Sequence, residues 1–119
     1  MRYPFVLLLF LMLLCGHTVF AGEMPVEKMM SFADSLFERG DHYRAITEYE
    51  RVIFFYPDHP LANTARFQIA QAYFEGDRLD QAIDRFRALN KELPDEEVGK
   101  KAYFMLGEAY YQRREYSRA

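Results

Sequence analysis

Apolar residues recur at intervals of three and four along most of the chain, which is the spacing of amphipathic helices. Between Val26 and Arg39, for example, the apolar stripe contains Met29, Leu36 and Phe37. The same spacing predicts helices over residues 42–55 and 60–74, over a fourth segment after Asp77, over a fifth from about residue 96, and at the start of a sixth over residues 116–119. No segment alternates apolar and polar positions as a strand would, so the predicted fold class is all-α.

Glycine and aspartate mark the turns between these helices. Gly40 can close the first helix, and the carboxylate of Asp41 can accept the free amides that begin the second. The pair Gly76 and Asp77 is predicted to serve in the same way between the third and fourth helices. The run from Arg113 to Glu115 is predicted to turn the chain again before the sixth helix.

The pattern repeats every 37 residues. A small residue stands at each step, and three positions later comes a large apolar residue. The small residues are Ala33, Ala70 and Gly107, and the large ones are Leu36, Tyr73 and Tyr110. A repeat of this length indicates stacked helical units rather than a single closed core.

These positions resemble tetratricopeptide repeats (TPRs). The matching residues are Ala33, Leu36, Gly40, Ala45, Tyr49, Val52 and Pro57 in the first repeat, Ala70, Tyr73, Gly76, Ala82, Phe86, Leu89 and Pro94 in the second, and Tyr103, Leu106, Gly107, Tyr110 and Ala119 in the third. The resemblance covers residues 26–119 and implies a helix–turn–helix α-solenoid, in which small residues let paired helices approach closely. The chain then divides into a signal peptide (1–21), a short leader (22–25), two full repeats (26–59 and 60–95) and a truncated third (96–119).

The period of 37 exceeds the usual repeat of about 34 residues. Longer first helices of this kind, and segments such as residues 56–65, resemble two bacterial envelope families with these repeats. One is the lipoprotein of the outer-membrane β-barrel assembly machinery, and the other is the periplasmic coordinator of the Tol–Pal system. The resemblance implies a non-catalytic scaffold for protein–protein interaction in cell-envelope or outer-membrane assembly.

The N-terminal segment has the three-part layout of a secretory signal peptide. Arg2 supplies a positive charge, residues 5–14 are continuously apolar, and the stretch ends in Ala21, after which we expect cleavage. The chain would then be exported, most simply to the periplasm, with outer-membrane association as a further option. Two alternatives stay open: an uncleaved membrane anchor, and lipid attachment at Cys15, although Leu14 fits a lipid-attachment motif poorly.

Composition and motifs argue against several functional classes. The chain carries 15 basic and 18 acidic residues, without the basic stripe that nucleic-acid binding requires. Cys15 is the single cysteine, and it lies within the predicted signal peptide. His42 and His59 stand at helix starts, where surface or capping roles are expected. No catalytic, phosphate-binding or metal-ligand motif is present, so no enzyme activity, cofactor or metal is predicted.

In TPRs, the first helices of successive repeats line a concave groove that holds partner segments. The corresponding positions here, three from each repeat, are Met30, Asp34, Phe37, Phe67, Gln71, Phe74, Phe104, Glu108 and Tyr111. Each triplet reads apolar, polar, aromatic, and the predicted partner is an apolar, neutral-to-basic protein segment. The middle residues of the three triplets, Asp34, Gln71 and Glu108, include two acids, which argues against binding of an acidic C-terminus. The alternative is that these rings pack between repeats and never meet a ligand.

The third repeat lacks its second helix, which leaves one flank of residues 103–110 without a partner. We expect either a longer protein, of which this is a fragment, or self-association through the open face. The alternative to a scaffold is a function of a different class. In it, the repeats would be the N-terminal docking module of a secreted enzyme whose catalytic domain lies beyond residue 119.

Overall fold

The computed structural model describes residues 24–118, and within this range every regular element is an α-helix. The helices are α2 (Val26–Glu38), α3 (His42–Phe55), α4 (Pro60–Glu75), α5 (Leu79–Glu92) and α6 (Glu97–Arg118). The all-α prediction is confirmed for this part of the chain. The predicted signal peptide, with Cys15, lies outside the described residues. None of the described helices is both long and apolar enough to span a membrane.

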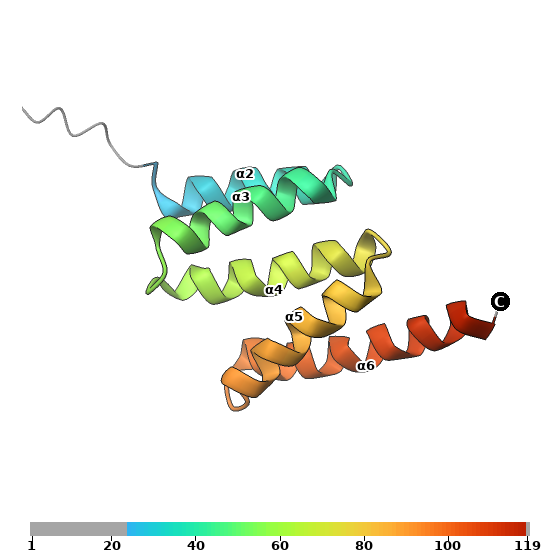
Figure 1. Cartoon of the computed structure of the whole chain (residues 1–119). Coiled ribbons are helices and arrows are strands. Elements are labelled where there is room, and N and C mark those ends of the chain that lie inside the picture. The colour runs from blue at the N-terminus through green and yellow to red at the C-terminus, as the bar shows by residue number, and fades with distance from the viewer. Residues whose placement is uncertain (1–23, 119) are drawn as a thin grey trace, which may run out of the picture.

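The helices form hairpins that stack in chain order (Figure 1). Each helix packs against the next, so α2 pairs with α3 and α4 with α5. The first helices of the hairpins also touch, α2 with α4 and α4 with α6. This arrangement is consistent with the predicted TPR-like solenoid, and it places α2, α4 and α6 as neighbours.

Alanine side chains allow the paired helices to approach closely. Ala33 and Ala45 in the first hairpin, and Ala70 and Ala82 in the second, have no solvent-exposed surface. Larger apolar side chains fill the space around them in two clusters. The fully buried large residues are Leu36, Tyr49, Val52, Ile69, Ile83, Phe86 and Leu89. Packing of small against large side chains therefore holds the hairpins together.

The turn between α2 and α3 depends on a backbone conformation that favours glycine. Gly40 has a φ of 77°, its amide donates to the carbonyl of Phe37, and the amide of Asp41 donates to the carbonyl of Leu36 at 3.0 Å. These are the two hydrogen bonds of a Schellman motif. The Asp41 side chain then accepts from the amide of Arg44 and caps α3, as predicted.

The second turn differs from the prediction by one residue. Asp77, not Gly76, has the positive φ, at 61°, and the amide of Arg78 donates to the carbonyl of Tyr73 at 2.8 Å. Arg78 is the residue before α5, so the prediction that Asp77 caps this helix was wrong. The 37-residue step explains the shift, because it aligns Asp77 with Gly40 and Arg78 with Asp41.

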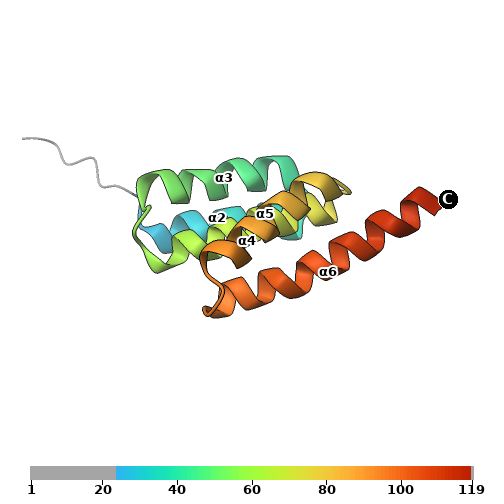
Figure 2. The same cartoon turned by 60° about the horizontal axis from the view of Figure 1, so that its bottom comes forward.

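The predicted turn at Arg113–Glu115 was also wrong, because α6 continues without a break to Arg118. The next position in the 37-residue series is Arg114. A left-handed backbone costs an arginine about 1–2 kcal/mol, whereas glycine and, less well, aspartate tolerate it. The helix therefore passes through the position at which α2 and α4 had ended. Figure 2 shows the C-terminal part of α6 projecting beyond the α4–α5 hairpin.

Two glycines of α6 have opposite surroundings. A Cβ atom at Gly99 would overlap the carbonyl group of Leu93, so α6 can begin close to the end of α5 only with glycine there. A Cβ atom at Gly107 would meet nothing within 4 Å. The close approach expected at Gly107 is therefore absent among the described residues, since α6 has no partner helix on that side.

Alanine substitutions at these glycines should change stability in opposite directions. We expect Gly99→Ala to lower the free energy of unfolding by about 2 kcal/mol or more through overpacking. Gly107→Ala should raise it by about 0.5–1 kcal/mol, because alanine is the better helix former and has open space here. Urea unfolding followed by circular dichroism would measure both. A loss from Gly107→Ala equal to that from Gly99→Ala would contradict this packing.

Candidate functional site

In the first repeat, the predicted groove residues are used largely for packing. Met30 is buried, and Phe37 is half-buried with its ring edge against His42, 5.8 Å between ring centroids. Asp34, also half-buried, accepts a hydrogen bond from the hydroxyl of Tyr49 on α3. These three side chains therefore link α2 to its neighbours, as the packing alternative expects.

In the second repeat, the predicted groove residues have different buried neighbours from those in the first. Phe67 packs against Phe86, with ring centroids 5.6 Å apart. The 37-residue step aligns Gln71 with Asp34 and Phe86 with Tyr49, so the hydroxyl of the first repeat has no counterpart here. Accordingly Gln71 Oε1 is buried without a hydrogen-bond partner, the one such side-chain atom found in residues 24–118.

The third repeat presents its predicted residues to solvent. Phe104 is 66% exposed and Tyr111 is 63% exposed, and Glu108 between them is also exposed. Tyr103, on the same helix, is 68% exposed. Single exposed rings are ordinary, but several on one helix form an apolar surface of the kind that marks interaction sites.

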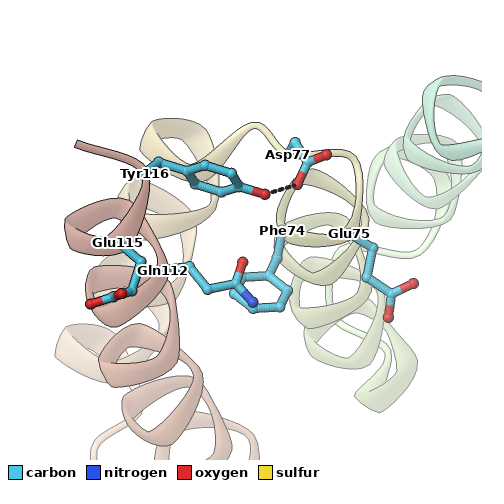
Figure 3. A pocket seen from close by; sticks show the side chains of 6 residues that line it. All are labelled: Phe74, Glu75, Asp77, Gln112, Glu115 and Tyr116. Carbon is cyan, nitrogen blue, oxygen red and sulfur yellow. Dashed lines mark hydrogen bonds between the residues drawn. The ribbon is translucent and has the colours of Figure 1, made fainter. Parts of the chain in front are cut away.

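An open pocket of about 700 Å³ lies between the C-terminal end of α4 and the last turns of α6. Its lining residues are Phe74, Glu75, Asp77, Gln112, Glu115 and Tyr116. Figure 3 shows the Phe74 ring and the Gln112 amide facing the gap, whereas the carboxylates of Glu75 and Glu115 point away from it. Tyr116 donates a hydrogen bond to Asp77 at 3.2 Å and bridges one end.

Of the predicted groove residues, Phe74 alone lines this pocket. The other five lining residues were not among the predicted ones. Glu115 and Tyr116 were missed because α6 was expected to turn at residues 113–115, which would have carried them away from α4. The available signal was the 37-residue series, in which a bulky Arg114 replaces the glycine that closes α2. Because α6 does not turn, its last residues form the second wall of the pocket.

Polar contacts hold this end of α6 against α5. The guanidinium of Arg113 lies 3.2 Å from Asp80 and stacks over the ring of Tyr110, 5.1 Å from its centroid. Arg87 lies on the same ring and donates to the Tyr110 hydroxyl. The Asp77 carboxylate raises the pKa of Tyr116. These contacts position the pocket wall.

The two histidines of the described region have structural roles. His59 caps α4 by accepting the amide of Leu61 at 3.0 Å, as predicted for a residue beside Pro60. His42 packs on Phe37 and lies 3.8 Å from Glu75. Among residues 24–118, no group of three or more histidine, cysteine or acidic side chains is arranged to hold a metal ion.

The chain matches the model of a known protein family. The family model described as tetratricopeptide repeat matches residues 30–97, which is more than half of the chain and covers the hairpins α2–α3 and α4–α5. No curated protein matches the sequence.

Removing the Tyr49 hydroxyl should destabilise the first hairpin. We expect Tyr49→Phe to lower the free energy of unfolding by about 1–2 kcal/mol, because a half-buried Asp34 oxygen loses its donor. The reciprocal change, Phe86→Tyr, offers a hydroxyl to Gln71 and should be neutral or raise stability by up to about 1 kcal/mol. Chemical unfolding of both variants provides the measurement. If Phe86→Tyr lowers the free energy of unfolding as much as Tyr49→Phe does, position 86 is not the structural counterpart of position 49.

Stability should also depend on Tyr49 at high pH. Burial raises the pKa of Tyr49 above its ordinary value of 10.0, and the hydrogen bond to Asp34 raises it further. Its contribution is therefore complete below about pH 10 and is lost as the pH rises, because the unfolded chain ionises first. Between about pH 10 and 11 we expect a steeper fall of the unfolding free energy in the wild type than in Tyr49→Phe. Tyr43→Phe, at an 81% exposed position, is the control and should leave the slope unchanged.

Proposed function

This chain belongs to the tetratricopeptide repeat family, and we propose that it is a non-catalytic scaffold of the cell envelope that binds segments of other proteins on the side formed by α2, α4 and α6. Such repeats generally mediate protein–protein interaction. The observation that carries the proposal is the surface of α6, where Phe104 and Tyr111 are both more than 60% exposed, and an open pocket at Phe74 lies between α4 and the same helix.

The chemistry of this surface supports an apolar partner of neutral or basic character. Aromatic rings give a large contact area with few rotatable bonds, which favours them as anchors in interfaces. Glu108 lies between the exposed rings, and Glu75, Asp77 and Glu115 line the pocket. Carboxylates at these places disfavour an acidic guest by like-charge repulsion.

The envelope assignment rests on the chain outside the helices and on the repeat length. Residues 1–21 have the layout of a secretory signal. The 37-residue period, with its longer first helices, is part of the resemblance to the two envelope families. We propose export across the inner membrane to the periplasm on this basis. The structural uses of His42 and His59 support a role without catalysis.

Alanine substitution of the exposed rings should weaken partner binding. We expect Phe104→Ala and Phe74→Ala each to reduce binding to an array of envelope-protein peptides by about tenfold, the loss of one aromatic anchor. Phe104 is two-thirds exposed, so its removal should leave the fold intact. The matched control is Phe54→Ala, at a 78% exposed position on α3 outside this surface. Binding that stays unchanged in both test variants, or that falls equally in the control, would rule out the surface.

A further inference from the structure

One side of α6 has no neighbour within residues 24–118, although the same side of α2 and of α4 is covered by a helix. The 37-residue step aligns Gly107 with Ala33 and Ala70. These two alanines are fully buried in the packing of α2 with α3 and of α4 with α5. A Cβ atom at Gly107 would instead meet nothing within 4 Å. A further helix therefore has room to approach α6 closely at this glycine.

Five exposed residues define this side of α6, which we call the Gly107 stripe. They are separated alternately by three and four positions, the spacing that keeps side chains on one face of a helix and forms the seam of a coiled coil. The stripe consists of Lys100, Tyr103, Gly107, Tyr110 and Arg114. Gln112, which faces the pocket beside α4, comes two residues after Tyr110, about 200° around the helix. The stripe therefore points away from that pocket.

The other end of the stack shows how this chain forms a side that faces solvent. Ala65 and Ala72 of α4 are fully buried against the first hairpin. The 37-residue step aligns them with Lys28 and Ser35 of α2, where no helix precedes within the described residues. Polar residues at the outer side of a terminal repeat keep a solenoid soluble. The Gly107 stripe has tyrosine rings instead, as expected of a side that another helix covers.

The charges of the stripe specify the helix that would cover it. Lys100 and Arg114 each lie seven residues from Gly107, about 10 Å along the helix axis. Neither forms an ion pair with another residue of the described region. Between them, the Tyr110 ring is held in place by Arg87, which donates to its hydroxyl. A helix with a small residue at its centre and a carboxylate near each end is complementary to this arrangement.

A second copy of this chain fits the stripe less well. Two copies of α6 packed antiparallel about Gly107 would place Lys100 of each chain opposite Arg114 of the other. Like charges brought together in an interface disfavour the pairing. Charge therefore favours a different protein as the occupant.

We propose that the Gly107 stripe binds an amphipathic α-helix of a partner protein, with alanine or glycine over Gly107 and an acidic residue near each end. This helix takes the place against α6 that α3 has against α2. The rings of Tyr103 and Tyr110 pack on either side of the small residue, and the carboxylates pair with the two terminal cations of the stripe. The contact is additional to the proposed function, whose pocket at Phe74 lies on the other side of α6.

The test uses the full 119-residue chain and a labelled helical peptide of about 21 residues, six turns. The peptide has alanine at its centre, leucine three residues to either side and glutamate seven residues to either side. A matched peptide has lysine in place of both glutamates. At about 50 mM salt we expect the glutamate peptide to bind at least about tenfold more tightly than the lysine peptide, measured by fluorescence anisotropy.

Two variants and a control locate the effect. Lys100→Glu combined with Arg114→Glu should reverse the order, so that the lysine peptide binds more tightly. Lys28→Glu combined with Arg39→Glu changes the net charge by the same amount at α2 and should keep the wild-type order. Gly107→Leu should weaken both peptides by at least about tenfold, because its side chain blocks close approach of a helix. Circular dichroism of each variant checks that the fold is kept.

Equal binding of the two peptides to the wild-type chain would overturn the proposal, as would an order that the Lys100→Glu and Arg114→Glu double variant does not reverse. Absence of binding by both peptides overturns it as well. A dimer in analytical ultracentrifugation that Gly107→Leu dissociates would assign the stripe to a second copy and overturn the choice of partner. The proposed function fails separately, if peptide-array binding is unchanged by Phe74→Ala and Phe104→Ala while the helical peptide still binds.

Discussion

Each hairpin of this protein depends on one residue with a left-handed backbone between its two helices. Gly40 takes this conformation freely, and Asp77 takes it with a φ of 61° at the same place in the next repeat. Arg114 is the third member of the series, and its side chain makes the conformation costly. The chain therefore forms hairpins at the first two positions and continues as a single helix at the third.

The length of α6 has consequences for both packing and function. Its final turns lie against the start of α5, held by the Arg113–Asp80 ion pair and by stacking of guanidinium groups on Tyr110. The same turns place Glu115 and Tyr116 opposite the end of α4 and so create the pocket. Phe104 and Tyr111 on the same helix stay exposed. Structural and candidate binding residues thus alternate around one helix.

The two complete hairpins show that a shared backbone permits different polar interiors. A hydroxyl from Tyr49 satisfies Asp34 in the first, whereas the aligned Phe86 leaves Gln71 Oε1 unpaired in the second. A basic residue likewise ends α2 but not α4. The periodic alanines keep the helix spacing, so these substitutions change hydrogen bonding and charge without changing the architecture. The second repeat therefore differs from the first in its buried hydrogen bonds and in the charge at the end of its first helix. The pocket lies at that end of α4.

Local chemistry was enough to predict the helices, the turn at Gly40, the cap at Asp41 and the close packing at Ala33 and Ala45, because each depends on neighbours within a few residues or on the repeat period. The sequence by itself determined the fold class and the family. Only the tertiary structure decided which of the nine predicted groove residues are exposed, that Gly99 rather than Gly107 makes the close contact, and that residues from α4 and α6 share a pocket. Exposure depends on which helix covers a side chain, and that is settled by segments distant in the sequence.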